Sequence, residues 1–168
     1  MGRILALDHT LFGVIHWKSR WSAATARRLS RSGDGWVYAA LALLPLAGGW
    51  SAGVDHLRSL AVAFGLELPL CFALKFLLRR ERPSSVFPGL TGGFRAADRF
   101  SFPSGHACAA FLHATVLGAR VPVLLPTLIL WATAVGWSRV RLGVHFPLDV
   151  LVGGLLGVTC GVVALHLT

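Results

Sequence analysis

Long apolar blocks constrain the fold of this chain more than any other feature of its sequence. The blocks at residues 57–78 and 147–167 are long enough for an α-helix to cross the hydrocarbon core of a bilayer, which takes about 20 residues. Only 14% of the 168 residues are charged, whereas a soluble domain carries roughly a quarter. With 55% hydrophobic residues and a mean hydropathy of +0.67, the chain is predicted to be an all-α integral membrane protein.

About five membrane-spanning helices are expected to form the bundle. They cover residues 36–50, 57–78, 104–118, 121–137 and 147–167. The first span is short, but Trp36 and Trp50 can anchor its two ends at the headgroups. The last span carries Gly153, Gly157 and Gly161 at a four-residue period, which predicts a seam of small residues where another helix packs closely.

The N-terminal segment has no block that is apolar enough to cross a bilayer. Residues 4–31 mix Leu, Phe, Ile and Trp with several arginines, which predicts one or two amphipathic helices that lie in the membrane interface. Trp17 and Trp21 would then sit at headgroup level. We therefore expect one domain over residues 1–168, made of an interfacial segment at 1–35 and a transmembrane bundle at 36–168.

Three short polar motifs lie between the apolar blocks. Six residues separate Lys75 from Arg82 and Pro83 in the first motif. The second motif is Pro103, Ser104, Gly105 and His106, and the third contains Ser138, Arg139, His145 and Asp149. The first motif ends the second span, the second motif starts the third span, and the third motif joins the fourth span to the fifth. In a bundle of five spans these three places emerge on the same side of the membrane. The motifs are therefore predicted to meet at one membrane face.

The residue types in these motifs suit a phosphate group. Lys75, Arg82 and Arg139 can neutralise its charge, and arginine can do so through two parallel hydrogen bonds. Ser104 can cap the third span, so that the N–H groups near Gly105 point at an anion where the helix dipole also favours it. Every arginine has an alternative use as a headgroup anchor. That use is assigned to Arg79, Arg80, Arg95 and Arg99.

Two histidines add the groups that phosphate chemistry needs. His145 can attack phosphorus if another group fixes its tautomer, and Asp149, four residues later, can accept a hydrogen bond from one ring nitrogen. His106 is then free to protonate the leaving oxygen and later to activate water. A lone histidine beside a proline is more often a capping or packing residue, but Asp149 and Arg139 favour the nucleophile here.

In their order and spacing, the three motifs resemble those of the phosphatidic acid phosphatase type 2 superfamily, which also contains the vanadium haloperoxidases. The resemblance runs from Lys75 to Asp149. It implies that His145 forms a phosphohistidine, that Asp149 orients it and that His106 is the acid and base. It also implies a set of phosphate-binding residues, namely Lys75, Arg82, Ser104, Gly105 and Arg139. It implies no metal and no cofactor. Arg141 stands where many relatives carry a neutral residue and would suit a more anionic headgroup.

Other polar features are open to two interpretations. Residues 80–102 form a long polar connection, and connections of this length are usually functional, so a lid over the site is predicted. Glu67 lies within a predicted span, where a carboxylate is costly and should face the bundle. His113 lies on the same helix face as His106 and could meet Glu67 in the bundle interior, either as a structural pair or as part of a proton path.

Basic residues outside the motifs predict the orientation in the bacterial inner membrane. Eleven lie on the face of the motifs: Arg3, Lys18, Arg20, Arg27, Arg28, Arg31, Arg79, Arg80, Arg95, Arg99 and Arg141. Only Arg58 and Arg120 lie on the other face, so the positive-inside rule places the site on the cytoplasmic side. The sites of many bacterial relatives face outward. The net charge of +9 does not indicate nucleic acid, because these residues are confined to segments between apolar blocks.

Three functions compete at this stage. The first is a lipid phosphatase, whose partners are its lipid phosphate substrate and the surrounding membrane lipids. A cytoplasmic site would suit a polyprenyl-phosphate sugar phosphate such as decaprenylphosphoryl ribose 5-phosphate, phosphatidylglycerophosphate or phosphatidate, and an outward site would suit undecaprenyl pyrophosphate. The second is a vanadate-dependent haloperoxidase, and the third is a non-catalytic membrane scaffold or lipid-binding protein.

Overall fold

The structure is a computed structural model that describes residues 2–18, 22–47, 49–87, 90 and 98–168. In these ranges it contains helices and no strands. The helices, in chain order, are α1 (Gly2–Lys18), α2 (Ala23–Arg31), α3 (Gly35–Ala47), α4 (Gly53–Leu78), α5 (Pro83–Val86), α6 (Gly105–Arg120), the 3-10 turn η1 (Pro122–Leu124), α7 (Leu125–Arg141) and α8 (Pro147–Leu167). The all-α prediction is therefore confirmed for this part of the chain.

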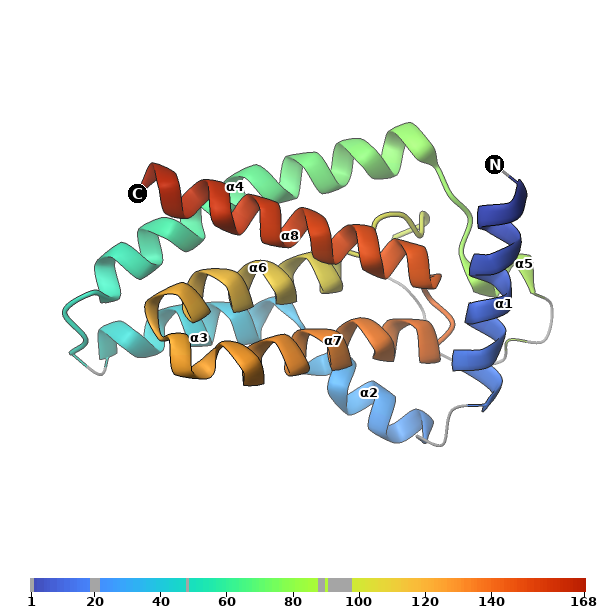
Figure 1. Cartoon of the computed structure of the whole chain (residues 1–168), viewed down its shortest axis with the longest axis horizontal. Helices are drawn as coiled ribbons and strands as arrows, with labels where there is room; N and C mark the ends of the chain where they lie inside the picture. Colours follow the sequence, from blue (N-terminus) through green and yellow to red (C-terminus); the bar gives the residue numbers. More distant parts are fainter. Residues whose placement is uncertain (1, 19–21, 48, 88–89, 91–97) are drawn as a thin grey trace.

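The longer helices run side by side along the long axis of the molecule (Figure 1). Helix α6 is central, because it packs against α4, α7 and α8. Helix α1 lies across one end of this bundle, and α2 lies beside the same end (Figure 1). All three motifs are found at that end, since α4 finishes there, α6 starts there and α7 connects there to α8.

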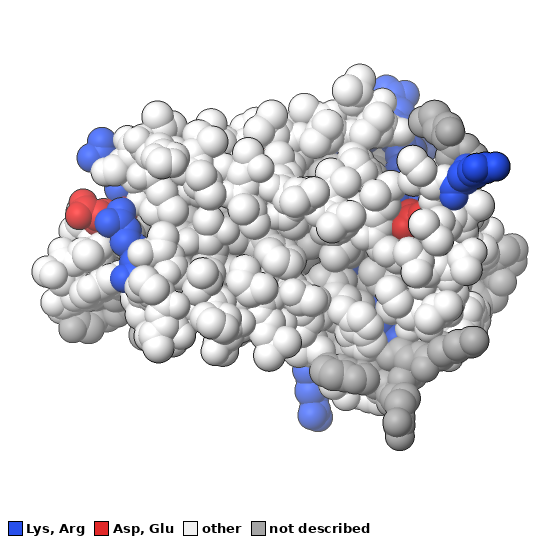
Figure 2. All heavy atoms as spheres, in the orientation of Figure 1, with Lys and Arg blue, Asp and Glu red and all other residues white. Residues whose placement is uncertain are grey.

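Three of the described helical segments are long and apolar enough to cross a membrane. They cover residues 53–86, 122–141 and 147–167, and they contain or largely overlap three of the expected spans. The residues of the other two expected spans form the helices α3 and α6, which have 13 and 16 residues and are shorter than these three segments. On the face shown in Figure 2, a broad belt without Lys, Arg, Asp or Glu separates charged side chains toward the two ends.

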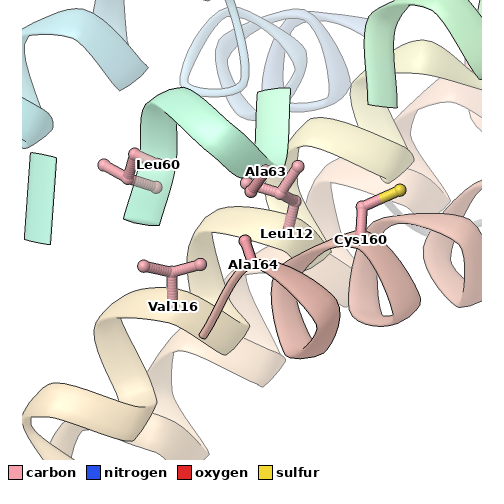
Figure 3. Close-up of a cluster of buried hydrophobic side chains, with 6 residues drawn as sticks. All are labelled: Leu60, Ala63, Leu112, Val116, Cys160 and Ala164. Atoms are coloured by element: carbon pink, nitrogen blue, oxygen red, sulfur yellow. The ribbon is translucent and has the colours of Figure 1, made fainter. Parts of the chain in front are cut away.

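Small and branched apolar side chains fill the centre of the bundle. One buried cluster joins α4, α6 and α8, as Figure 3 shows: Leu60, Ala63, Leu112, Val116, Cys160 and Ala164. Cys160 takes part as an apolar side chain, and all three cysteines are buried and unbridged. Because the contacts are made mostly by small side chains, the helix backbones can approach closely.

The predicted glycine seam on α8 is confirmed, and it faces α6. A Cβ atom on Gly157 would lie 2.1 Å from the backbone oxygen of Cys108, and one on Gly153 would lie 2.5 Å from the backbone oxygen of Ser104. A Cβ atom on Gly161 would lie 3.0 Å from Cβ of Thr115. This close approach fixes the start of α6, including the second motif, against α8.

The N-terminal helices are not only a surface layer. Trp17 is exposed, as expected of a residue at the headgroups, but α1 also buries Phe12 against Val140 and Phe146. It buries the carboxylate of Asp8 as well. Helix α1 is therefore packed onto the end of the bundle that carries the motifs. Arg20, Trp21, Arg95 and part of the predicted lid, residues 88–89 and 91–97, lie outside the described residues.

Candidate active site

A cavity of about 770 Å³ opens at the end of the bundle where the motifs meet. Residues from all three motifs line it: Lys75, Arg82, Gly105, His106, Arg139 and His145. The structure therefore places the two histidines and the three cations in one site, as the predicted topology requires. Ser104 and Asp149 are fully buried beside it, and the Ser104 N–H donates to the Asp149 carbonyl over 2.9 Å.

His145 is held by a backbone carbonyl. Its Nδ1 lies 2.6 Å from the carbonyl oxygen of Ser101, which can only accept, so Nδ1 carries the proton and Nε2 keeps its lone pair. Nε2 lies 3.5 Å from Nη1 of Arg82 at the cavity. Burial, together with Arg139 and Arg82, lowers the pKa of His145 to about 4 against the opposing effect of Asp149. The ring is therefore neutral at neutral pH, as a nucleophile requires.

The expectation that Asp149 accepts the hydrogen bond of His145 is wrong in this structure. Its Oδ2 lies 3.8 Å from Nδ1, which is beyond hydrogen-bonding distance. The reason is that both carboxylate oxygens are engaged elsewhere. Oδ2 accepts from the N–H of Phe146 over 2.8 Å, and Oδ1 accepts from Arg80 over 2.6 Å. Asp149 acts on His145 through charge and through the backbone that precedes α8, while Ser101 sets the tautomer.

His106 has a carboxylate partner that sequence reasoning missed. Its Nε2 lies 3.1 Å from Oδ1 of Asp34, in the turn between α2 and α3. An ionised carboxylate can only accept, so Nε2 of His106 carries a proton. The negative charge of Asp34 stabilises the doubly protonated ring, which is the form that can act as an acid. The only signal in the sequence was a lone aspartate within the polar break at residues 32–35.

A second carboxylate lies between two of the predicted phosphate-binding cations. Asp98 is 3.0 Å from Nζ of Lys75, and it forms a short ion pair with Nη2 of Arg82. Its backbone oxygen also accepts from Nε of Arg82 over 3.1 Å. Partial burial raises the pKa of Asp98, but the two cations outweigh this effect and hold the pKa below its ordinary value. A carboxylate thus occupies a place that suits the oxygens of a phosphate.

The remaining predicted phosphate ligands are buried at the same end. Arg139 donates from Nη1 to the hydroxyl of Ser30 in a short hydrogen bond, which ties α7 to α2. Ser104 precedes α6 as its N-cap residue, but its hydroxyl makes no hydrogen bond to the backbone of the first turn. This hydroxyl is buried and has no partner among the residues that the structure describes. It is therefore available to an oxygen of a bound anion.

The predicted headgroup anchors fall into two kinds. Arg79 is exposed and donates to the carbonyl of Phe76, and Arg99 is exposed beside the ring of Phe100. Arg80 is different, because its guanidinium is largely buried between the carboxylates of Asp8 and Asp149. The anchor assignment is therefore wrong for Arg80. Its cause is the docking of α1, which brings Asp8 to a position that no local sequence pattern indicates.

Glu67 and His113 are both buried, but no hydrogen bond or ion pair joins them in the described part of the chain. The His113 ring lies near the rings of Tyr38 and His56, whose centroids are 5.7 and 6.1 Å from its own. Glu67 instead lines the apolar part of the cavity. The expected pairing is therefore not formed.

Comparison with known proteins agrees with this geometry. The chain is 35% identical over 145 residues to the decaprenylphosphoryl-5-phosphoribose phosphatase of Mycobacterium tuberculosis, covering 83% of this chain and 77% of that protein. It is 36% identical over 101 residues to an undecaprenyl-diphosphatase of Sulfolobus acidocaldarius, covering 59% of this chain and 48% of that protein.

Two crystal structures share the fold over most of their length. LpxE of Aquifex aeolicus matches with a TM-score of 0.84 and 30% identity, covering 95% of both chains. The first transmembrane PAP2 type phosphatidylglycerolphosphate phosphatase from Bacillus subtilis matches with a TM-score of 0.77 and 25% identity, covering 99% of this chain and 87% of that one. The family model of the PAP2 superfamily matches residues 56–168, which include all three motifs. This membrane protein belongs to the PAP2 superfamily.

Proposed function

We propose that this chain is an integral-membrane lipid phosphatase that hydrolyses a phosphomonoester or pyrophosphate through a phosphohistidine at His145. The observation that carries the proposal is the shape of the cavity, which joins the polar site to an apolar wall between α3 and α4. The wall is made by side chains such as Ala42, Leu57, Leu60, Phe64 and Phe72. A lipid with a phosphate at one end matches a cavity that is cationic at one end and apolar along its length.

In the first step, the lone pair on Nε2 of His145 attacks phosphorus as the bond to the lipid oxygen breaks. The imidazolium form of His106 keeps its Nε2–H bonded to Asp34 and gives its other ring proton, on Nδ1, to this leaving oxygen. His106 becomes neutral, and the lipid departs as an alcohol or a lipid monophosphate. In the second step, His106 takes a proton from water, and the resulting hydroxide attacks phosphorus. The bond between phosphorus and Nε2 of His145 breaks, its electrons return to that nitrogen, and phosphate leaves.

The phosphate is held through both steps by groups on three elements. Lys75, Arg82 and Arg139 neutralise its charge, and the hydroxyl of Ser104 and the N–H of Gly105 bond its oxygens. These donors are oriented before substrate arrives, which favours the charge that develops in the transition state. Asp98 has to leave Lys75 and Arg82 for the phosphate to bind.

The substrates named for the relatives suggest which lipids to test. They span a polyprenyl sugar phosphate, a polyprenyl pyrophosphate and a phosphatidylglycerol phosphate. We propose a polyprenyl-phosphate sugar phosphate as the first candidate, because the mycobacterial phosphatase matches over 83% of this chain. Arg141, in the last turn of α7 two residues after Arg139, adds a cation at this end of the bundle, which suits an anionic headgroup.

We also propose five spans, with α3 and α6 as the shorter two, and a site on the cytoplasmic face of the inner membrane. Both short helices run alongside the three long ones (Figure 1). Arg80 is left out of the count because its guanidinium is buried. Ten basic residues then remain on the face of the motifs, against Arg58 and Arg120 on the other face, and this excess supports the cytoplasmic orientation.

Phosphate release from detergent-solubilised protein tests the activity. The panel contains phosphatidate, phosphatidylglycerophosphate, polyprenyl pyrophosphate and a polyprenyl sugar phosphate. We expect release by the wild type and by the control His166→Ala, which changes an exposed histidine at the other end of α8. We expect none from His145→Ala. A scaffold protein would release nothing in any variant, and equal release by His145→Ala would exclude His145 as the nucleophile.

Labelling with an impermeant thiol reagent tests the orientation. Ser84 in α5 and Ser51 before α4 are both exposed and lie at opposite ends of the bundle. In intact cells we expect Ser84→Cys to be shielded and Ser51→Cys to react. The reverse pattern would place the site on the outer face.

A further inference from the structure

We propose that Asp8 and Arg80, which lie outside the three motifs, are positioning residues for His145. Together with Asp149 they form a carboxylate–guanidinium–carboxylate bridge, which makes α1 part of the catalytic assembly. The inference rests on the proposed phosphatase function.

The bridge has short hydrogen bonds on both sides of one guanidinium. Nη1 of Arg80 donates to Oδ1 of Asp149 over 2.6 Å, and Nη2 donates to Oδ2 of Asp8 over 2.6 Å. The side chains of Asp8 and Asp149 are 4% and 0% exposed, and that of Arg80 is 16% exposed. Two carboxylates buried this close to one another are stable only if a cation lies between them.

The second oxygen of each carboxylate binds the start of α8. Oδ1 of Asp8 accepts from the N–H of Leu148 over 2.9 Å, and Oδ2 of Asp149 accepts from the N–H of Phe146 over 2.8 Å. Amides at the start of a helix have no acceptor within the helix, so side chains have to supply one. The bridge therefore fixes the backbone directly after His145.

Arg80 also reaches the ring of His145 along its own backbone. The carbonyl of Arg80 accepts from the N–H of Ser101 over 2.8 Å. The carbonyl of Ser101 in turn accepts from Nδ1 of His145 over 2.6 Å. One residue thus supports both the peptide that carries the nucleophile and the acceptor that sets its tautomer.

Aromatic packing brings α1 to this place. His9 stacks on Phe146 with ring centroids 4.9 Å apart, and Phe12 meets the same ring at 5.5 Å. The guanidinium of Arg80 lies over Phe146 as well, 4.2 Å from its centroid. Phe146 follows His145 directly, so this packing and the bridge act on the same peptide. Helix α1 delivers Asp8 through these contacts.

The consequence for catalysis is geometric. A nucleophile displaced by about 1 Å can lose on the order of 10²-fold in rate while substrate binding is kept. The carboxylate of Asp8 binds Arg80 and the N–H of Leu148, so the interactions that its loss removes are those of the bridge and the start of α8. Loss of the bridge is therefore expected to lower kcat and to leave KM almost unchanged.

The test compares Asp8→Asn and Arg80→Lys with the control Arg79→Lys, measured on the best lipid of the panel. Asp8→Asn keeps the shape and an oxygen for Leu148 but loses the charge that binds Arg80. We expect kcat and the rate of phosphoenzyme formation to fall at least tenfold in both variants, with KM within threefold of wild type. Arg79 is exposed, and its control variant is expected to keep both values.

A double variant separates positioning from general loss of structure. If Asp8 acts through Arg80, Asp8→Asn together with Arg80→Lys should lower kcat no further than Arg80→Lys alone. The inference would be overturned if the double variant lost kcat by the product of the two single losses, or if Asp8→Asn kept the kcat of the wild type. Either result would leave the proposed phosphatase function standing. Asp8→Glu, which keeps the charge, is expected to retain more kcat than Asp8→Asn, and a smaller kcat would contradict the bridge.

A readout without turnover keeps the two proposals distinct. The Nδ1–H proton of His145 is followed by ¹⁵N-edited NMR in micelles and assigned by its absence in His145→Gln. We expect its resonance to shift in Asp8→Asn and not in Arg79→Lys. A wild type that releases no phosphate from any lipid would overturn the proposed function. An unchanged resonance in Asp8→Asn would overturn the positioning role.

Discussion

Replacing Asp98 by asparagine is expected to tighten the binding of inorganic phosphate. In the free protein the Asp98 carboxylate pairs with Lys75 and Arg82, the cations that we assign to the substrate phosphate. Phosphate has to displace this carboxylate before it can bind. Asparagine keeps the size of the side chain but not its charge, so the competition weakens.

The size of the effect follows from the exposure of the pair. The Asp98 side chain is 44% exposed, so each of its two ion pairs is worth the surface value of about 0.2–1 kcal/mol rather than that of a buried pair. Both cations are nearly buried, which favours the upper part of this range. Two pairs then give about 1–2 kcal/mol, which corresponds to about 5- to 30-fold in affinity.

The assay is competitive inhibition of lipid hydrolysis by inorganic phosphate. We expect the inhibition constant of Asp98→Asn to fall by this factor and the KM for the lipid to fall with it. Glu81→Gln is the matched control, because it removes the same charge from an exposed side chain beside Arg82. Equal or weaker inhibition in Asp98→Asn would show that its carboxylate does not occupy the phosphate position.

Three further predictions concern other parts of the site and the fold. His106→Ala should lose about 10²–10⁴-fold in kcat on a lipid but much less on p-nitrophenyl phosphate, whose leaving group needs no proton; equal losses would exclude the general acid. Gly157→Leu should destabilise the protein by about 1–3 kcal/mol or more, because its Cβ would lie 2.1 Å from a backbone oxygen. Thermal unfolding in detergent checks this against Gly65→Leu, where nothing lies within 4 Å, and equal midpoints would contradict the seam. In NMR titrations His145 should remain neutral as pH falls through 6.5 and gain its proton near pH 4, whereas a midpoint near 6.5 would mean that burial has no effect.

Much of the site was predictable because its motifs are local in sequence. Lys75 and Arg82 follow an apolar block, and Gly105 and His106 begin another. Counting the apolar blocks between the motifs places the motifs on one face of the membrane, and this needs no knowledge of side-chain packing. The glycine period on α8 was predictable for a similar reason, since a repeat of four maps directly onto one face of a helix.

The partners of these residues were not predictable, because they come from distant segments through packing. Asp34 reaches His106 from 72 positions away, and Asp8 reaches Arg80 from the same separation. A single aspartate in a turn or a helix carries no local signature. The same limit explains the misassigned acceptor of His145. Spacing suggested Asp149, but the nearer acceptor is a backbone carbonyl at Ser101, which no side-chain pattern can reveal.

The central claim is that phosphorus becomes bonded to His145, and acid-free trapping of the phosphoenzyme tests it most directly. Protein mixed with lipid substrate is quenched in alkali within milliseconds, digested and analysed by mass spectrometry. We predict a phosphoryl group on the His145 peptide in the wild type, more of it in His106→Ala on an activated substrate, and none in His145→Gln. A wild type that turns over lipid with no phosphorylated histidine, or with the phosphoryl group on another residue, would contradict the account.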